Sequence, residues 1–566
     1  MFSISKLPKS YLIIFALLCS NPIFAQQKVN PKYYKNGVVV SAHPVASLVG
    51  LNILKKGGNA VDAAVAVQFA LAVVYPNAGN IGGGGFLVFR GAKGETATLD
   101  FREKAPGQAT RDMYLDENGN PIKEKSLLGH LAAGVPGTVD GMVKAHAKYG
   151  KLSWKEVVQP SVDLAAKGFP ITEKQAGEFN RAKESFIKFN PDGTALVKPS
   201  GEWVKGENLI QPELATTFKL IRDKGRAGFY EGKVAAYTVK EMNRGNGIIT
   251  AKDLKDYQSV WRMPIIGKYK DYKVITMPPA SSGGIALVQL LHSVEPYPMS
   301  KWGHNQDSTV QLIVEAERRV YADRSSHLGD PDFYKVPQKG LLDVNYQKQR
   351  MSNMSWSHAT PSAEVNPGTP AMKESEQTTH YSIVDKDGNA VSVTTTLNGA
   401  YGCKVFVKGA GFLLNNEMDD FSVKAGSPNM YGVTGGVANS IAPGKRMLSS
   451  MTPTIIEKDG KLFMVVGTPG GSTIITSVFQ TILNVIEFGQ DMQEAVTSKR
   501  FHHQWLPDEV YTEKDVFSNR TLTELTGKGY RFVPRTSIGR VDAILSTSKG
   551  YQGGADPRGD DTSLGW

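Results

Sequence analysis

A predicted β-hairpin in the second half of the chain constrains the fold more than any other local pattern. Two runs rich in β-branched and aromatic residues, 379–384 and 390–397, flank a strong turn signal at 385–389. This arrangement predicts two antiparallel strands joined by a tight turn. A three-residue loop with its glycine in the left-handed conformation pairs the first and last residues of that turn. Counting outward from this pair places Thr378 opposite Thr396, so we expect the two hydroxyls to be neighbours.

Thr378 carries a hydroxyl that becomes a useful nucleophile only when a base lies beside it. Its own α-amine is such a base once the chain before it has been cut, and that amine has an ordinary pKa of about 7.7–8.0. Residues 352–377 are polar and proline-rich, which predicts a linker that is cut between Gln377 and Thr378. A Thr-Thr pair taken alone is more often the plain start of an edge strand, so the chemistry depends on other residues.

Length and composition indicate an ordinary globular protein. With 566 residues the chain exceeds the usual size of one core, which predicts two domains or one large layered domain. Hydrophobic residues make up 41% and charged residues 21%. The formal charge is +11, but the Lys and Arg residues are scattered and form no basic run interleaved with aromatics. We therefore interpret the charge as a solvated surface and expect no nucleic-acid partner.

Residues 1–25 resemble an export signal. Lys6 and Lys9 precede an apolar run at 11–18, and 21–25 provides a helix breaker and a small last residue, which predicts a mature chain beginning at Gln26. The bulky residue before Cys19 argues against a lipoprotein site, and no later segment offers about 20 uninterrupted apolar residues. We expect a soluble exported protein, periplasmic or secreted, without a membrane anchor. Cys403 is then its only cysteine, so no internal disulfide can form.

Helical and strand patterns alternate along both halves of the chain. Residues 59–74 predict a largely buried helix capped by Asn59. Further helices are expected at 157–166, 214–224, 285–294 and 474–487, and strands at 86–90, 96–103, 411–414, 454–457 and 461–466. Sheets flanked by helices in both halves predict a layered α/β sandwich in which the two segments share one core.

Several polar groups lie at predicted strand ends or in turns. Asn398 follows Thr396 by two residues, which places both on one side of the strand. The stretch 415–420 ends a predicted strand with a carboxylate cluster, which is either a solvated loop or a site for an ammonium group. Gly470 and Gly471 precede a helix, where their amides could form an oxyanion hole or a simple turn.

Metal and cofactor patterns are absent from the sequence. His380, His502 and His503 form no two-histidine face, and neither Cys-x-x-Cys nor His-Glu-x-x-His occurs. The glycine run 82–85 leads from helix to strand, which is the wrong order for a phosphate-binding loop. We therefore expect neither a metal nor an organic cofactor.

Taken together, the motifs closely resemble those of the γ-glutamyltranspeptidases. In the second half the matching stretches are 378–382, 415–422, 449–453 and 467–472, and in the first half 79–86, 100–103 and 132–138. They cover nearly the whole mature chain in the family's order. The resemblance implies an N-terminal-nucleophile hydrolase with an αββα four-layer sandwich. It also implies a precursor that cuts itself into a large subunit, 26–377, and a small catalytic subunit, 378–566, which remain together as a heterodimer.

The resemblance also assigns roles to individual residues. It implies that Thr378 attacks first the peptide bond before it and later the substrate, while Thr396 hydrogen-bonds the nucleophile. Gly470 and Gly471 match the oxyanion hole. The remaining matches are to substrate-binding positions: Asn398, Glu417 and Asp420 for an α-ammonium, and Arg102, Ser449 and Ser450 for an α-carboxylate. Residues 425–436, with Tyr431, resemble a lid loop that favours glutathione-type enzymes.

Three readings of the activity follow. The first is a γ-glutamyltransferase and glutathione hydrolase that transfers the γ-glutamyl group to water, an amino acid or a peptide. The second is a related acylase for glutaryl-cephalosporin-like amides or poly-γ-glutamate. A glutaryl group has no α-ammonium, so the intact ammonium-binding set of Asn398, Glu417 and Asp420 argues against it. The third is an exported binding protein that keeps the fold without processing, which a single uncut band on a denaturing gel would support.

Overall fold

The computed structural model describes residues 31–368, 379–424 and 437–566. The predicted export signal, the nucleophile Thr378 and the lid with Tyr431 lie outside these ranges. The large and small subunits predicted from the sequence therefore join within a stretch that is not described, and their boundary stays a prediction.

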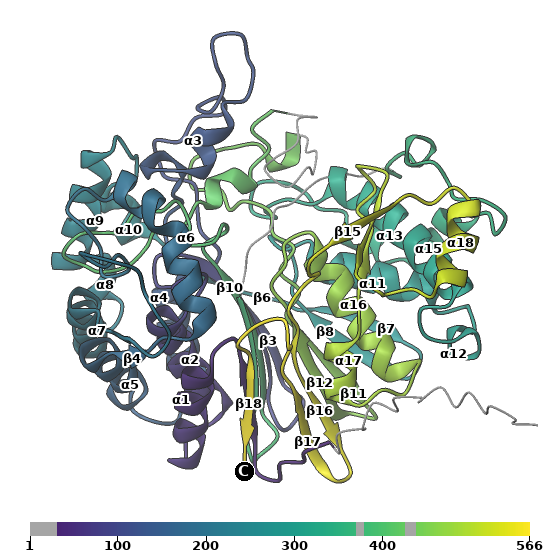
Figure 1. Cartoon of the computed structure of the whole chain (residues 1–566), viewed down its shortest axis with the longest axis horizontal. Helices are drawn as coiled ribbons and strands as arrows, with labels where there is room; N and C mark the ends of the chain where they lie inside the picture. The colour runs from purple at the N-terminus through teal and green to yellow at the C-terminus, as the bar shows by residue number, and fades with distance from the viewer. Residues whose placement is uncertain (1–30, 369–378, 425–436) are drawn as a thin grey trace, which may run out of the picture.

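Two antiparallel sheets form the centre of the molecule (Figure 1). The seven-stranded sheet has the order β18 (Thr562–Gly565), β1 (Val38–Ser41), β9 (Thr379–Val384), β10 (Ala390–Thr396), β2 (Gly84–Arg90), β3 (Thr96–Asp100) and β6 (Val260–Arg262). The six-stranded sheet has the order β17 (Gly550–Gly554), β16 (Asp542–Thr547), β12 (Lys461–Gly467), β11 (Thr454–Lys458), β8 (Tyr272–Thr276) and β7 (Ile265–Tyr269). Each sheet contains strands from before and from after residue 378, which confirms that both segments build one core.

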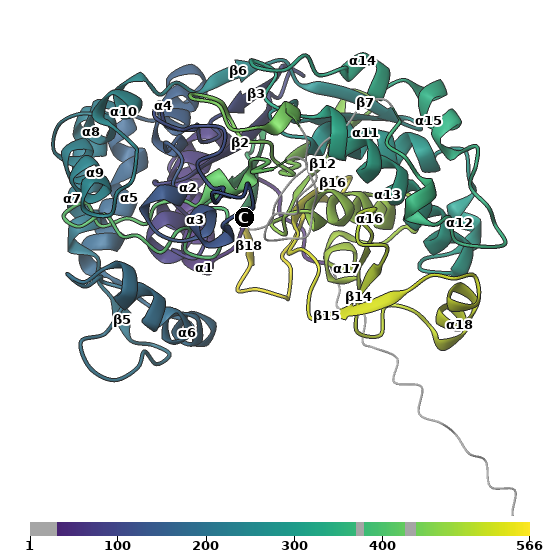
Figure 2. The ribbon, with the colours of Figure 1, turned by 90° about the horizontal axis from the view of Figure 1, so that it is seen from above.

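The two sheets pack face to face, and helices cover their outer faces. β9 and β10 contact β12, and the Ser392 hydroxyl donates to the Val466 carbonyl across the interface at 3.2 Å. Figures 1 and 2 show one set of helices beside the seven-stranded sheet: α1 (Pro44–Lys55), α2 (Ala60–Val74), α4 (Thr138–Tyr149), α5 (Trp154–Lys167) and α7 (Pro212–Lys224). Beside the six-stranded sheet lie α11 (Gly283–Val294), α13 (Asp307–His327), α16 (Thr473–Ile486) and α17 (Met492–Thr497). The predicted αββα sandwich is thus confirmed.

The remaining elements are short or peripheral. The helices are α3 (Lys123–Leu127), α6 (Glu173–Phe189), α8 (Ala227–Tyr230), α9 (Gly232–Arg244), α10 (Ala251–Asp256), α12 (Met299–Trp302), α14 (Gln338–Leu341), α15 (Val344–Met351) and α18 (Asn519–Gly527). The strands are β4 (Phe169–Pro170), β5 (Asn208–Leu209), β13 (Phe501–His502), β14 (Val510–Glu513) and β15 (Phe532–Arg535).

The predicted hairpin has the predicted register. Thr379 pairs with Thr395, and the Asp385 amide donates to the Asn389 carbonyl at 3.1 Å. Gly388 adopts φ of 87°, a left-handed conformation that costs glycine little. Because Thr378 precedes the described strand, its position opposite Thr396 stays a prediction.

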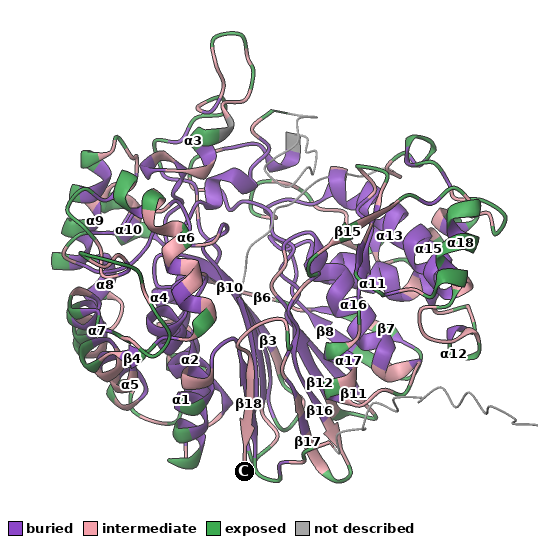
Figure 3. Ribbon diagram, in the orientation of Figure 1, coloured by how far each residue is buried: buried purple, intermediate pink, exposed green. Residues whose placement is uncertain are grey.

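Helix α2 forms the inner wall behind the seven-stranded sheet. The Asn59 side chain accepts hydrogen bonds from the amides of Val61 and Asp62, and the Asp62 carboxylate accepts one from the Asn59 amide. Such a reciprocal cap satisfies amides that the first helical turn leaves without partners. Every residue of α2 is buried, which agrees with the buried helix predicted from its alanine-rich sequence. Figure 3 shows that the central strands are buried, whereas the outer helices are partly exposed.

Two sequence predictions about strands are wrong. Residues 411–414 form a loop, because they bond back to 403–407 through pairs such as the Leu414 amide and the Val405 carbonyl at 3.0 Å. That local pairing leaves no edge free to join a sheet. The acidic stretch does not end a strand either; Glu417–Asp420 is a 3₁₀ helix with every residue buried. Among the described residues, no helix is long and apolar enough to cross a membrane.

Candidate functional site

The candidate site lies at one rim of the sandwich. β9 begins there, β10 and β3 end there, and β2 begins there, as the pairing of Thr396 with Gly84 and of Phe86 with Asp100 requires. On the facing sheet β12 ends at Gly467, whose Cα lies against the His380 ring of β9. Residues that follow these strand ends are therefore brought together although they are far apart in sequence.

Arg102 is the cation of this rim, two residues beyond β3. Its amide donates to Asp100 Oδ1 at 3.0 Å and its carbonyl accepts from the Tyr257 hydroxyl at 2.8 Å. Its guanidinium donates to Glu417 and to Asp420. Charge-assisted bonds of this kind are the strong ones, and they fix the plane of the guanidinium. The structure thus brings together the predicted carboxylate-binding arginine and two predicted ammonium-binding acids.

Buried acids outnumber the guanidinium. Glu103 Oε2 lies 3.7 Å from Arg102 Nη1, and the side chains of Glu103, Glu417 and Asp420 are each 3% exposed or less. Burial raises the pKa of Glu103 to about 8, although Arg102 opposes the shift, and burial also raises the pKa of Glu417 well above its ordinary value. The acidic stretch is therefore not a solvated loop, and it offers buried carboxyl oxygens that can accept from an added cation.

Glu103 was not singled out by the sequence, although it directly follows Arg102. Neither of its carboxyl oxygens has a hydrogen-bond partner among the described residues. An unpartnered charge in such a place is costly, whereas a neutral acid is tolerated. The sequence could have pointed to Glu103 only through its position directly after Arg102. When such a neighbouring carboxyl is buried together with the guanidinium, its pKa is shifted.

The two predicted serines directly follow two residues that contact the same guanidinium. Arg102 donates to the carbonyls of Met447 at 3.3 Å and Leu448 at 3.1 Å, immediately before Ser449 and Ser450. The Ser450 hydroxyl accepts from Arg324 at 3.0 Å. Arg324 was also missed, because it belongs to the long charged helix α13, where one arginine among several carries no distinguishing pattern.

Thr396 and Asn398 link the hairpin to the acidic stretch. Thr396 Oγ1 accepts from the Asn398 amide at 2.7 Å, and Asn398 Nδ2 donates to the Asn416 carbonyl at 3.0 Å. We had expected strand alternation to place Asn398 on the same side as Thr396, but this is wrong, because β10 ends at Thr396 and Asn398 adopts φ of 66°. The asparagine still lies next to the predicted ammonium site, since Asn416 directly precedes Glu417.

Gly470 and Gly471 lie between β12 and α16. Their φ angles are 136° and 57°, in the region that side chains rarely adopt. Their carbonyls accept from the amides of Thr473 and Ile474 at 3.1 and 3.0 Å. The two glycines therefore stand at the positive end of a helix dipole, where negative charge is favoured.

The three histidines of the sequence analysis are buried and play structural parts. His380 contacts the hydroxyls of Thr394 at 2.9 Å and Ser382 at 3.0 Å between the sheets. Burial lowers the pKa of both His380 and His502 to about 3, so they are neutral at pH 7. In the described part of the chain, no group of three His, Cys, Asp or Glu side chains could hold a metal ion.

Comparisons with known proteins agree with this geometry. The family model for gamma-glutamyltranspeptidase matches residues 46–566. The glutathione hydrolase proenzyme of Escherichia coli (strain K12) is 47% identical over 540 residues, covering 95% of this chain and 93% of that protein.

Two solved structures support the same relationship. A cephalosporin acylase from Bacillus halodurans aligns with a TM-score of 0.84 at 26% identity, over 100% of this chain and 99% of that one. A Helicobacter pylori gamma-glutamyltranspeptidase chain aligns with a TM-score of 0.59 at 43% identity, over 60% of this chain and 97% of that one. The chain belongs to the γ-glutamyltranspeptidase family.

Proposed function

We propose that this protein is a γ-glutamyltransferase and glutathione hydrolase. The observation that carries the proposal is one buried guanidinium, Arg102, held between Glu417 and Asp420 at the rim where β9 begins. An α-amino acid group presents a carboxylate and an ammonium side by side. Such a zwitterion can replace the internal ion pairs with equivalent ones, so both charges of the site stay paired when substrate binds.

Substrate binding would use the residues that surround this ion-pair cluster. The α-carboxylate of the γ-glutamyl group binds Arg102, assisted by the hydroxyls of Ser449 and Ser450. Its α-ammonium binds Glu417, Asp420 and the side chain of Asn398. Fixing both charges holds the γ-carbonyl in one place, which lowers the entropic cost of attack.

Thr378 supplies the nucleophile and, after scission, the base. Its hydroxyl oxygen attacks the γ-carbonyl carbon while its α-amine takes the hydroxyl proton, and Thr396 orients the hydroxyl. The amides of Gly470 and Gly471 stabilise the oxyanion. Collapse breaks the amide bond, the departing amine takes the proton, and a γ-glutamyl ester remains on Thr378. Water or the amine of an acceptor amino acid or dipeptide then attacks this ester and regenerates the hydroxyl.

Maturation is part of the same proposal. The precursor loses residues 1–25 on export to the periplasm or the medium and cuts itself between Gln377 and Thr378. The name proenzyme of the Escherichia coli relative supports processing. The Helicobacter pylori chain supports separate subunits, because the alignment spans 97% of that chain but only 60% of this one. Residues 425–436, with Tyr431, serve as a lid over the bound γ-glutamyl group.

Three measurements test the proposal. N-terminal sequencing of the smaller fragment should begin at Thr378, and Thr378→Ala should yield one uncut band. Hydrolysis of a γ-glutamyl anilide should exceed that of a glutaryl anilide, because only the former carries an α-ammonium for Glu417 and Asp420. Preference for the glutaryl compound would make the protein an acylase. A wild-type chain that stays whole would make it a binding protein.

A further inference from the structure

We propose that Thr468 and Thr473 are positioning residues that aim the two oxyanion amides, one hydroxyl for each amide. The inference rests on the proposed function, in which the amides of Gly470 and Gly471 receive the developing negative charge. It concerns the hydroxyls of Thr468 and Thr473, which are distinct from the amide donors themselves. Their effect passes through the peptide planes of the loop that follows β12.

The first hydroxyl controls the peptide between Pro469 and Gly470. Thr468 Oγ1 donates to the Pro469 carbonyl at 2.7 Å, and this peptide is trans. In a planar trans peptide the C=O and N–H bonds point in opposite directions. Anchoring the Pro469 oxygen therefore fixes the direction in which the Gly470 amide points.

The second hydroxyl controls the next peptide in the same way. The Gly470 carbonyl accepts from Thr473 Oγ1 at 2.7 Å and from the Thr473 amide at 3.1 Å. Because that carbonyl shares a peptide plane with the Gly471 amide, it sets the direction of the second donor. Glycines at φ of 136° and 57° have weak conformational preferences of their own, so external anchors must select one orientation.

Thr468 is itself held by the chain behind it. The Arg540 amide donates to Thr468 Oγ1 at 2.7 Å, so this buried hydroxyl both accepts and donates. Gly539 packs against the loop so closely that a Cβ there would lie 2.5 Å from Ser477 Oγ and 3.1 Å from Thr468 Oγ1. The Thr468 hydroxyl is therefore held by the Arg540 amide on one side and by the Pro469 carbonyl on the other.

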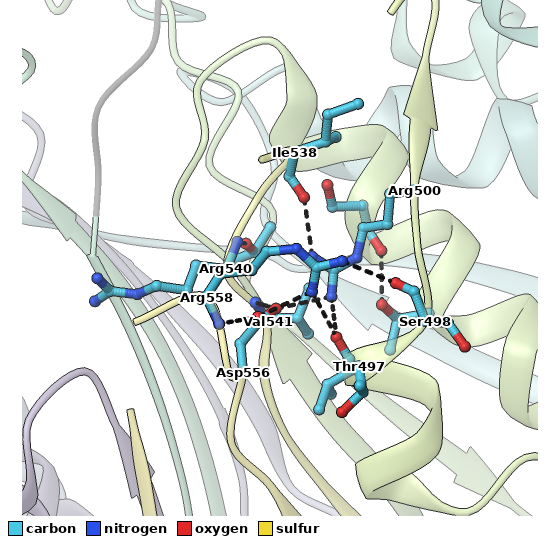
Figure 4. A network of polar contacts seen from close by, with 12 residues as sticks. Thr497, Ser498, Arg500, Ile538, Arg540, Val541, Asp556 and Arg558 are labelled. Carbon is cyan, nitrogen blue, oxygen red and sulfur yellow. Dashed lines mark hydrogen bonds and ion pairs between the residues drawn. The ribbon is translucent and has the colours of Figure 1, made fainter. Parts of the chain in front are cut away.

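A network of buried ions fixes this rear segment, residues 538–541 (Figure 4). Arg500 donates to the Ile538 carbonyl at 2.9 Å and to Asp556 at 2.8 Å, and Asp556 also accepts from the Val541 amide at 2.8 Å. Anchoring at both ends makes the Arg540 amide a rigid donor, since rigid support is what keeps catalytic donors aligned. The orientation of the Gly470 amide thus depends on contacts with the C-terminal strands.

The test compares valine and serine substitutions in the mature enzyme. Thr468→Val and Thr473→Val keep the shape of the side chain but remove the hydroxyl, whereas Thr468→Ser and Thr473→Ser keep it. Loss of a whole oxyanion donor costs about 10²–10³ in kcat, so a donor that is only misaimed should cost roughly 10- to 100-fold. The serine variants should stay within about 3-fold of wild type. KM for a γ-glutamyl anilide should change less than about 3-fold in all four.

Thr481→Val is the matched control. Thr481 is a buried threonine of α16, about two helical turns beyond Thr473, and its hydroxyl donates to the Ser477 carbonyl at 2.8 Å. It should lose stability as the other valine variants do, yet keep kcat within about 2-fold. A boronic acid bearing the γ-glutamyl chain provides a second readout, because its tetrahedral adduct mimics the transition state. Its Ki should rise in parallel with the fall in kcat/KM.

Each outcome decides the inference. Valine variants with unchanged kcat, or serine variants as impaired as the valines, overturn it. A loss of kcat/KM that comes only from a higher KM also overturns it, because that would indicate an effect on ground-state binding. If a valine variant stays uncut, its serine partner must restore both maturation and turnover, and failure to do so refutes the role. Failure of the wild type to hydrolyse the anilide would instead refute the proposed function.

Discussion

Replacing Glu103 with glutamine tests whether a neutral carboxyl is built into the ion-pair cluster. Burial raises the pKa of this acid to about 8, so it is largely protonated at pH 7. The amide of glutamine has the same shape as the protonated acid and cannot ionise. Glu103→Gln should therefore change kcat/KM by less than about 3-fold at pH 7, where it replaces one neutral group by another.

Above pH 8 the wild type and the variant should diverge. Ionised Glu103 would compete with the substrate carboxylate for Arg102, whose Nη1 lies 3.7 Å from Glu103 Oε2. Two unit charges at that separation interact by about 4 kcal/mol at an effective dielectric constant of ~20, roughly a thousandfold in binding. Only the protonated enzyme then binds well. Between pH 8 and about 9.5 its fraction falls roughly 16-fold for a pKa of about 8.

The assay is kcat/KM for a γ-glutamyl anilide from about pH 6 to 10. The wild type should give a bell-shaped profile, because the Thr378 amine must lose its proton at about pH 7.7–8.0 while Glu103 must keep its own. Glu103→Gln should retain the acid limb and lose the alkaline limb. An alkaline limb that persists in the variant refutes the reasoning. A variant at least 10-fold slower at pH 7 also refutes it, because that would show a required negative charge.

Two further substitutions probe the site and the core. Asp420→Asn removes one charged acceptor of the ammonium site, which should raise KM about 10- to 100-fold with a smaller effect on kcat; an unchanged KM would exclude Asp420 from binding. His380 keeps a pKa of about 3 because of burial, so the stability it contributes is present above pH 6.5 and is lost as the pH falls towards 3. The quantity to measure is the slope of the free energy of unfolding against pH, obtained by urea unfolding of the uncut Thr378→Ala chain. His380→Gln should lower this slope by about 1.36 kcal/mol per pH unit below pH 6.5. An identical slope would show that His380 takes up its proton in the folded state as readily as in the unfolded one.

Local sequence was sufficient to predict a contact when both partners lie within a short stretch of the chain. The hairpin register follows from the turn at 385–389, and the cap of α2 follows from Asn59 and Asp62, because both partners lie within a few residues. Burial of Glu417 could not be predicted in this way. Its partner Arg102 is 315 residues away, and only the pairing of β3 with β2 and of β2 with β10 brings the two together.

The same limit explains the strand predicted at 411–414. Its last three residues, Phe412 to Leu414, are apolar, but a strand also needs a sheet edge to pair with, and the segment instead pairs with 403–407. Arg102, Glu417 and Asp420 meet at one rim because the chain segments that carry them follow strand ends. The residues missed, Glu103 and Arg324, act through burial and distant contacts, which no short pattern reports.

Interleaved strands give the proposed cut a structural consequence. β9, from the later segment, lies between β1 and β10, and β1 also pairs with β18 near the C-terminus. Scission after Gln377 would therefore leave each fragment with unpaired strand edges if the two separated, and buried backbone groups without partners are costly. Arg102 would lose both carboxylates as well. The fragments should consequently remain one folded unit without a disulfide. The proposed cut would free the Thr378 amine and leave Arg102 paired with Glu417 and Asp420.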